Sequence, residues 1–260
     1  MKALELFDLT GKVAVVTGGS VGLGAQIAEA LSEVGANLVI AARKVERCAA
    51  LCQELEKNGI KAIPAACDVS NPEDCKNLID LTVKEFGTID ILVNNAGFTW
   101  GADILDYPMD KWQKVFDVNV TGLFNLSILA AKVMKEKGGG KIINIASISG
   151  FYGDPPGGKS TPAYNASKGA VITLTKELAV KLAKYGICVN SIAPGFFPTH
   201  MSGGVLEKEK VRNYLLSKIP LNRFGNEDDL KGAVVLLSSA ASDYITGHCL
   251  MVDGGKMAAR

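Results

Sequence analysis

Tyr164 and Lys168, four positions apart, are the pair of residues in this chain best suited to moving a proton. They open a helical pattern, and residues at i and i+4 share one helix face, so both side chains can reach one site. A phenol with a pKa of about 10 is a weak base near neutrality, and a nearby cation lowers that pKa. We therefore expect Lys168 to lower the pKa of Tyr164. Such a pair can give a proton to a developing alkoxide or take one from an alcohol.

A hydroxyl group stands at the end of a strand pattern. The apolar run Lys141–Ala146 is followed by Ser147, Ile148, Ser149 and Gly150. Ligands of open α/β sheets bind beyond the carboxyl ends of the strands, so a serine here can hydrogen-bond a reacting oxygen. Position alone does not choose between the two serines.

A glycine-rich turn near the N-terminus is typical of a dinucleotide site. The strand pattern Val13–Thr17 leads into Gly18, Gly22 and Gly24, and a helical pattern starts at Ala25. Glycines permit a tight turn and a close approach of the backbone to a pyrophosphate. The N–H groups at the helix N-terminus then face the phosphates. The order of strand, turn and helix is the context that this motif requires.

Strand and helix patterns alternate along the chain, which predicts a single dehydrogenase-type domain over residues 1–260. The strand patterns are short and apolar throughout, as expected of parallel strands buried on both faces. Helical patterns between them end at glycines. We expect an α/β fold, a doubly wound Rossmann domain with a parallel seven-stranded sheet and helices on both faces. The strand patterns are Val13–Thr17, Leu38–Ala42, Ala62–Ala66, Ile89–Asn94, Lys141–Ala146, Cys188–Ala193 and Cys249–Val252.

Composition and charge exclude several classes of protein. The 260 residues carry a formal net charge of +1 and are 48% apolar, without the basic stripe of a nucleic-acid or membrane-surface binder. No apolar run approaches the roughly 20 residues that span a bilayer. The first ten residues lack the apolar core of a signal peptide. We expect a cytoplasmic protein that binds neither nucleic acid nor membrane.

Six cysteines raise the question of disulfides or a metal. No Cys-x-x-Cys pair occurs, and His200 and His248 lie far along the chain from the first four cysteines. A structural zinc site needs closer spacing. We expect no metal and six reduced thiols packed as small hydrophobic side chains. The six are Cys48, Cys52, Cys67, Cys75, Cys188 and Cys249.

The glycine spacing after Thr17, Gly-x3-Gly-x-Gly, resembles the fingerprint of the short-chain dehydrogenase/reductase family, in its non-extended branch. The resemblance covers the whole chain. Within the family, the chain is most similar to 3-oxoacyl-thioester reductases and to gluconate or polyol dehydrogenases. It implies an NAD(P)-dependent enzyme that interconverts a secondary alcohol and a ketone. The other matching motifs are Cys67-Asp68-Val69, Asn94-Asn95-Ala96-Gly97, Phe116-Asp117-Val118-Asn119-Val120, Pro194-Gly195 with Thr199, and Ile245-Thr246-Gly247 through Val252-Asp253-Gly254-Gly255.

The resemblance implies roles for these residues. The family's Ser-x-x-Gly pattern selects Ser147, whose hydroxyl would steady the substrate oxygen beside Tyr164, the acid/base residue. Lys168 would also hold the nicotinamide ribose, and Asn119 would complete the tetrad by ordering a helix and a proton-relaying water. Asp68 would contact the adenine. The implied cofactor contacts are Gly18, Ser20, Val21, Gly22, Leu23, Gly24, Arg43, Lys44, Asp68, Val69, Asn95, Ala96, Gly97, Tyr164, Lys168, Pro194, Gly195 and Thr199.

The end of the second strand pattern indicates which nicotinamide cofactor is preferred. An acidic residue there bonds the ribose 2′-hydroxyl of NAD, whereas an arginine nearby accommodates the 2′-phosphate of NADP. Ala42 ends this strand pattern, and Arg43 and Lys44 follow. We predict a preference for NADP(H) and leave NAD(H) open as an alternative.

The substrate is less determined than the reaction. Aromatic residues on segments that line the substrate mouth in relatives favour an apolar or ring-bearing ketone, such as a 3-oxoacyl thioester. Lys159, Lys256 and Arg260 would then meet the phosphates of an acyl carrier, although charged residues of loops and chain ends are usually only solvated. Two alternatives stay open, a sugar-acid or polyol dehydrogenase and a non-catalytic nucleotide-binding subunit. The candidate substrate residues are Phe98, Trp100, Tyr152 and Phe197.

Two loops would shape access to the site. The longest irregular stretch, residues 194–222, is expected to act as a substrate lid. Ser147 and Tyr164 are 17 positions apart, more than in many relatives, and the extra residues at 153–159 would form a surface loop on the pocket rim. The family's usual assembly implies a tetramer.

Overall fold

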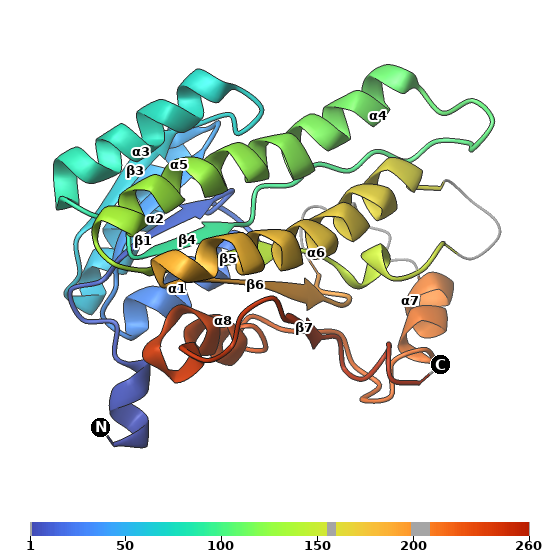
Figure 1. Cartoon of the computed structure of the whole chain (residues 1–260). Helices are drawn as coiled ribbons and strands as arrows, with labels where there is room; N and C mark the ends of the chain where they lie inside the picture. The colour runs from blue at the N-terminus through green and yellow to red at the C-terminus, as the bar shows by residue number, and fades with distance from the viewer. Residues whose placement is uncertain (1, 155–159, 199–208, 260) are drawn as a thin grey trace.

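Seven parallel strands form one sheet in the computed structural model, which describes residues 2–154, 160–198 and 209–259 (Figure 1). The strand order is β3-β2-β1-β4-β5-β6-β7, which confirms the expected doubly wound Rossmann fold. The strands are β1 (Val13–Thr17), β2 (Asn37–Ala42), β3 (Ala62–Ala66), β4 (Ile91–Asn94), β5 (Gly140–Ile145), β6 (Ile187–Pro194) and β7 (Cys249–Val252). The helices are α1 (Leu23–Glu33), α2 (Val45–Leu55), α3 (Pro72–Phe86), α4 (Met109–Phe116), α5 (Leu123–Glu136), α6 (Pro162–Leu182), α7 (Glu209–Leu216) and α8 (Lys231–Ser238).

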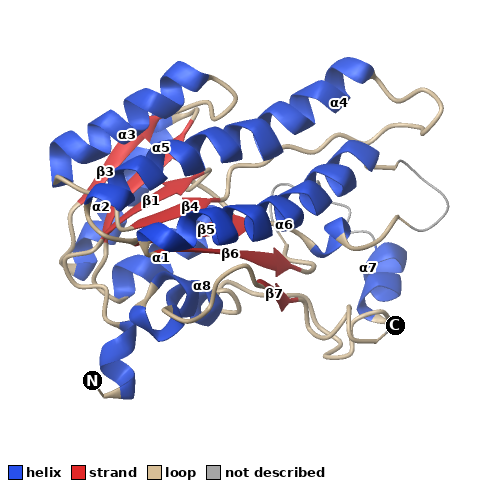
Figure 2. Ribbon diagram, viewed as in Figure 1, coloured by secondary structure: helices blue, strands red, loops and turns tan. Residues whose placement is uncertain are grey.

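Successive side chains along each strand point to opposite faces of the sheet and fill two hydrophobic cores, one on each face. In β1, Ala14 and Val16 pack on one side with α1, α2 and α8, whereas Val15 packs on the other with α3, α5 and α6. The helices accordingly flank the sheet on both faces (Figure 2). Burial on both faces explains why the strand patterns are apolar at every position.

The stretch expected to be irregular, residues 194–222, contains the helix α7. Val211 and Leu215, four residues apart and half-buried, supply the short apolar stripe that this helix packs. The glycines and prolines before it concealed so short a pattern. Residues 199–208, including Thr199, lie outside the described residues, so the lid stays a prediction. The same holds for most of the loop expected at 153–159.

A π-helical turn, Asp117–Gly122, joins α4 to α5 and carries Asn119. It lies against the segment after β3: a Cβ on Gly122 would come within 2.3 Å of the Val69 carbonyl oxygen. Only glycine allows this approach. Such turns are frequent at functional sites because the extra residue redirects one side chain. Here that side chain is Asn119, 1% exposed.

The part of the chain that the structure describes holds no helix able to cross a membrane and no cluster of three or more metal-ligating side chains. The six cysteines are free thiols. Four of them, Cys48, Cys52, Cys67 and Cys75, are buried within the two cores, as expected of small hydrophobic side chains.

A buried polar network crosses the sheet beneath the strand ends. Asn94 Nδ2 donates to Asn144 Oδ1 and to Ser127 Oγ, both at 2.9 Å, and Asn144 Nδ2 donates to Thr175 Oγ1 at 3.0 Å. All four residues are at most 3% exposed. Because buried amides must find partners, this network ties β4 and β5 to helices α5 and α6 in one register.

Replacing the central amide should destabilise the protein. Asn144→Ala leaves polar groups of Asn94 and Thr175 without their partner, at a cost of about 1–3 kcal/mol in the free energy of unfolding. Urea denaturation measures it. The exposed Asn213→Ala on α7 serves as control and should change stability by less than about 0.5 kcal/mol. An Asn144→Ala protein as stable as the wild type would contradict the network's role.

Candidate active site

The predicted site residues gather at the carboxyl edge of the sheet. The strand arrows in Figure 1 point toward the side where α6 begins, and α7 and the C-terminus lie on that side. Ser147 follows β5, and Tyr164 and Lys168 lie in the first two turns of α6. Asn95 follows β4. Residues from distant parts of the sequence are therefore brought to one edge, where open α/β sheets bind ligands.

Ser147 and Tyr164 share a hydrogen bond between their side chains. Ser147 caps a short 3-10 turn, and its Oγ accepts from the Ser149 N–H at 3.1 Å. Its own proton can therefore be directed to another oxygen. The structure thus distinguishes the two serines, because Ser149 contributes a backbone donor that orients Ser147.

The pKa of Tyr164 is raised, against the expectation that Lys168 lowers it. Burial is the larger effect, and the hydrogen bond with Ser147 only partly opposes it. The Lys168 ammonium lies 5.6 Å from the ring centroid of Tyr164 and donates elsewhere. In the protein without ligand, the phenol is accordingly held protonated near neutral pH, as a donor requires.

Lys168 carries an ammonium group buried at the end of β5. The residue is 4% exposed, and its Nζ donates to the Ile145 carbonyl oxygen at 2.7 Å. Burial lowers its pKa to about 8. A Cβ added to Gly97 would lie 3.8 Å from this Nζ, with Asn119 Oδ1 nearest at 3.6 Å. The missing side chain at Gly97 therefore leaves space beside the ammonium.

Asn119 joins two segments of the site. Its Oδ1 accepts from the Phe98 N–H at 2.8 Å, and its Nδ2 donates to the Phe98 carbonyl at 3.0 Å. The same Nδ2 donates to Ser167 Oγ at 2.9 Å, and Ser167 in turn donates to the Tyr164 carbonyl at 2.7 Å. Asn119 thus connects the turn after β4 to the helix that carries the tyrosine.

The glycine turn after β1 is interlocked with the turn after β4. Thr17 Oγ1 accepts from the N–H groups of Asn95 and Ala96, both at 3.1 Å. Asn95 Nδ2 donates to the carbonyls of Thr17 and Gly18 at 3.0 Å. Gly24 lies so close that its Cβ would be 2.2 Å from the Gly18 carbonyl oxygen. The start of α1 is therefore fixed directly above the turn.

The conformation of this turn fits a pyrophosphate. Gly22, the N-cap of α1, has φ +57° and ψ −137°, a conformation that glycine adopts readily and other residues rarely do. It has no side chain to cap the helix, so the first N–H groups point outward. Leu23 begins the helix, and Val21 is exposed beside it.

Charged residues gather where the adenosine end of a dinucleotide would lie. Ala42 ends β2, and the next two residues, Arg43 and Lys44, are exposed. Partial burial raises the pKa of Asp68, but hydrogen bonds from Ser70 and the charges of Arg43 and Lys114 outweigh it and lower the pKa overall. Arg43 and Asp68 therefore face a common space.

The expected nicotinamide segment lies against the end of β7. Gly195 N–H donates to the Val252 carbonyl at 2.9 Å, and a Cβ on Gly195 would lie 2.7 Å from Asp253 Cα. Pro194 ends β6 directly before it. This packing fixes where the chain leaves the sheet toward residues 196–198.

The candidate aromatic residues have basic neighbours. Lys114 Nζ lies 5.2 Å from the centroid of the Phe98 ring, and Lys111 Nζ lies 5.2 Å from that of Trp100. Tyr152 lies under a third lysine, Lys256, at 4.5 Å. Three of the aromatic rings that the sequence assigns to an apolar mouth therefore have an ammonium group beside them.

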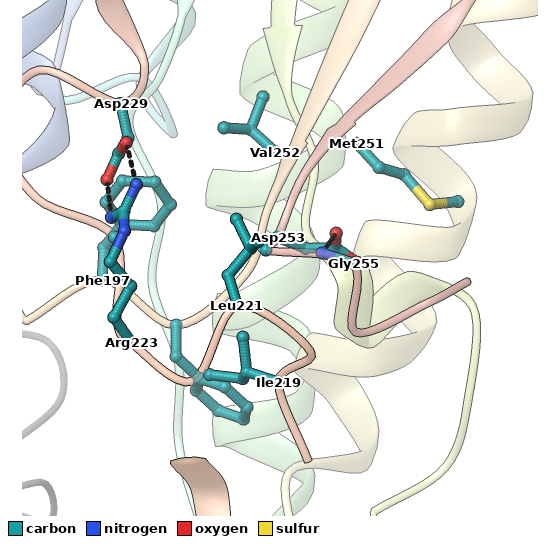
Figure 3. Close-up of a pocket in the computed structure, with 12 residues that line it drawn as sticks. Phe197, Ile219, Leu221, Arg223, Asp229, Met251, Val252, Asp253 and Gly255 are labelled. Atoms are coloured by element: carbon teal, nitrogen blue, oxygen red, sulfur yellow. Dashed lines mark hydrogen bonds and ion pairs between the residues drawn. The ribbon is translucent and has the colours of Figure 1, made fainter. Parts of the chain in front are cut away.

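Phe197 differs from these residues because it is buried. It is 8% exposed and packs tightly on Gly225, beside a pocket of about 280 Å³ (Figure 3). Arg223 forms a bidentate ion pair with Asp229 at the side of this pocket. Among the residues that line it are Phe196 and Asp253 but none of the predicted tetrad.

Comparison with known proteins agrees with this geometry. A short-chain dehydrogenase family model described as enoyl-(acyl carrier protein) reductase matches residues 18–256. The chain belongs to the short-chain dehydrogenase/reductase family. It is an NAD(P)-dependent alcohol/ketone oxidoreductase.

Several members of this family are similar over nearly their whole length. The chain is 42% identical to 2-dehydro-3-deoxy-D-gluconate 5-dehydrogenase of Bacillus subtilis, covering 96% of each chain. It is 38% identical to 5-keto-D-gluconate 5-reductase of Escherichia coli, covering 98% of this chain and 99% of the relative. The solved gluconate 5-dehydrogenase from Burkholderia cenocepacia, in complex with NADP and tartrate, matches with a TM-score of 0.93, 37% identity and full coverage of both chains.

Sequence reasoning missed residues that position the site. Thr17 and Ser167 hold backbone segments through their hydroxyl groups, and Lys114 adds charge near both Asp68 and Phe98. Thr17 begins the glycine-rich fingerprint that the sequence identified, but its role as acceptor for two backbone N–H groups was not predicted. Ser167 and Lys114 carried no local signal, because their partners come from distant segments.

The buried charge of Lys168 should make stability depend on pH. Its pKa is about 8 in the folded protein, against about 10.5 ordinarily. Between these values the unfolded chain binds more protons, so this group raises the wild-type free energy of unfolding as pH increases. Below pH 8 the ammonium destabilises the fold by something on the order of 3 kcal/mol. The free energy of unfolding of Lys168→Met should therefore exceed that of the wild type by the largest amount at pH 7. This difference should disappear toward pH 10.5.

Urea denaturation of the cofactor-free protein at several pH values between 7 and 10.5 measures this difference. The exposed Lys181→Met, near the other end of α6, is the matched control and should show no such trend. If the difference in free energy of unfolding between Lys168→Met and the wild type stayed constant with pH, the buried charge would not be its cause.

Proposed function

We propose that this enzyme interconverts a keto group and a hydroxyl group on a sugar acid of the gluconate type, with NADP(H) as preferred cofactor. The observation that carries the substrate class is the lysine beside three of the four candidate aromatic rings, those of Phe98, Trp100 and Tyr152. Lys114 and Lys256 place positive charge beside Phe98 and Tyr152, which suits an anionic substrate better than an apolar one; Lys111, beside Trp100, is ion-paired with Asp110 at 2.6 Å. The relatives support this reading, since the enzymes named above act on gluconate derivatives.

The proton chemistry rests on Ser147 and Tyr164. In the direction of reduction, the substrate carbonyl oxygen accepts hydrogen bonds from both hydroxyl groups, and Tyr164 transfers its proton as the oxygen gains charge. The raised pKa of Tyr164 keeps that proton available. The bound cofactor supplies the hydride for reduction and accepts one in oxidation. In oxidation, Tyr164 takes the proton back.

Lys168 stabilises the tyrosinate that forms when the proton leaves. Its ammonium is buried near the phenol, so the attraction acts with little screening by water. The same group would hold the nicotinamide ribose in the space left at Gly97. Asn119 positions these residues through Phe98 and Ser167.

The cofactor would lie across the interlocked turns. Its pyrophosphate would face the turn from Gly18 to Gly24, with Ser20 and Val21 at its rim. Asp68 and Val69 would contact the adenine, and the turn Asn95-Ala96-Gly97 would lie along its length. Pro194 and Gly195 would lie near the nicotinamide, together with Thr199 from outside the described residues. The expected tetramer remains part of this proposal.

A substrate panel with a tyrosine variant tests the proposal. The wild type should reduce 5-keto-D-gluconate with NADPH at a higher kcat/KM than it reduces a 3-oxoacyl thioester. Tyr164→Phe should lower kcat by roughly a hundred- to ten-thousandfold, because it removes the acid/base group. Its affinity for NADPH should hardly change. The fully exposed Tyr244→Phe serves as control.

The substrate class and the assignment of the acid/base residue can each be contradicted by a separate result. A preference for the thioester would overturn the substrate class. A Tyr164→Phe enzyme with half the wild-type rate would overturn the assignment of the acid/base residue.

Arg43 should account for the choice of cofactor. A charge-assisted bond from its guanidinium to the 2′-phosphate is worth about 1.5–3 kcal/mol, or roughly ten- to a hundredfold in affinity. Arg43→Ala should lose that factor for NADPH and keep its NADH kinetics. The exposed Arg47→Ala, one turn further along, should keep both. Steady-state kinetics with each cofactor decide, and a wild type that prefers NADH would refute the assignment.

A further inference from the structure

A buried thiol, that of Cys48, joins two of the segments that would bind the cofactor. Cys48 is 0% exposed and ends the first turn of α2. Its side chain is hydrogen-bonded to the hydroxyl group of Ser20, in the glycine-rich turn. The sequence predicts only that Cys48 packs as a small hydrophobic side chain, so a polar partner at the cofactor site gives this thiol a further role.

The same thiol lies against the residues on either side of Arg43, the residue proposed to bind the 2′-phosphate of NADP(H). Its Sγ donates to the Lys44 carbonyl oxygen at 3.7 Å. It is also hydrogen-bonded to the backbone of Ala42. The thiol therefore holds Ser20 beside the backbone that carries Arg43.

The backbone before Ser20 is itself held against β2. The Gly19 N–H donates to the Ala41 carbonyl oxygen at 3.4 Å, and a Cβ added to Gly19 would lie 3.0 Å from Cγ2 of Ile40. Because the main chain has little room to move toward β2, the direction of the Ser20 hydroxyl depends on its side-chain torsion. Cys48 is hydrogen-bonded to this hydroxyl, so the thiol favours one of its rotamers.

A thiol and a hydroxyl group side by side hold two protons that can be redirected. In the protein without ligand, the proton of Cys48 is directed to Lys44, so Ser20 donates to the sulfur. A phosphate beside Ser20 would be a stronger acceptor than the sulfur, because the bond to it is charge-assisted. Ser20 would then donate to the phosphate, and Cys48 would turn its own proton to the Ser20 oxygen. The hydroxyl group thus keeps a hydrogen bond to the thiol in both states.

We propose that Cys48 positions the hydroxyl group of Ser20 as a second donor to the 2′-phosphate of NADP(H), beside Arg43. The proposal rests on the cofactor preference in the proposed function and adds a residue that strengthens this preference from within the core. Cys48 is buried and acts through Ser20, so it is a positioning residue that does not touch the cofactor.

Calorimetric titration of the cofactor-free protein with NADP⁺ and NAD⁺ tests this role, because the two ligands differ only by the 2′-phosphate. Cys48→Ala removes the sulfur and should lower the ratio of the two affinities by about three- to tenfold, the net effect of one hydrogen bond. The affinity for NAD⁺ should hardly change. Cys48→Ser should keep most of the ratio, because a serine can bond both Ser20 and the carbonyl four residues before it.

Cys52→Ala is the matched control. Cys52 is 3% exposed and packs in the same core as Cys48, but it lies about 6 Å further along α2, away from the strand ends. This variant loses the same atom from the same core and should keep the wild-type ratio. Thermal unfolding of each variant checks that it folds. If Cys48→Ala does not fold, Cys48→Val, which fills the space without a hydrogen-bonding group, carries the test.

A double variant shows whether Cys48 acts through Ser20. Ser20→Ala alone should lower the ratio of affinities at least as much as Cys48→Ala does. If the thiol acts only by directing the hydroxyl, Ser20→Ala combined with Cys48→Ala should lower the ratio no further than Ser20→Ala alone. A purely structural effect of Cys48 would instead add to that of Ser20.

The outcomes separate the positioning role from the proposed function. A wild type that binds NAD⁺ as tightly as NADP⁺ overturns the proposed cofactor preference and the role of Cys48 with it. A wild type that prefers NADP⁺, with the same ratio in Cys48→Ala or an equal loss in Cys52→Ala, overturns the role of Cys48 alone. Additive losses in the double variant do the same. A ratio lowered in Cys48→Ala, kept in Cys48→Ser and Cys52→Ala, and not lowered further in the double variant supports it.

Discussion

A lysine ammonium held away from water is the constraint on which the site depends. Lys168 donates to the end of β5, lies beside the space left at Gly97 and is carried by the first turns of α6. Removing a charge from water is costly, so the groups around it must be fixed. The polar network of Asn94 and Asn144 and the connection through Asn119 supply that rigidity.

Close backbone approach is the second requirement, and glycine meets it. The turns after β1 and β4 interlock through Thr17 and Asn95, and Gly24 stands against Gly18 with no room for a side chain. The rigid half of the site is therefore made of backbone. The half proposed to bind the substrate is made of side chains, among them three aromatic rings with a lysine beside each.

Much of the fold was predictable because its signals are local. Apolar runs placed all seven strands within two residues of their ends, and the motifs around Gly18, Ser147 and Tyr164 led to one edge of the sheet. What failed depends on tertiary surroundings. The pKa of Tyr164 follows from burial rather than from its neighbour on the helix, and helix α7 was concealed by the glycines before it. The aromatic residues indicated an apolar mouth because the lysines over them come from other elements.

The π-helical turn at Asp117–Gly122 has a consequence for how the family's sequences can change in length. Each residue turns an α-helix by about 100°, so the extra residue in this turn sets the angle between α4 and everything after it. Loss of one residue from this turn would restore a regular helix. It would also rotate one of two groups out of place, either Asn119 away from Phe98 or the apolar face of α5 away from its core. Within α4 and α5 an insertion or deletion would therefore displace one of these contacts, whereas the loops before α4 and after α5 can change in length without rotating either.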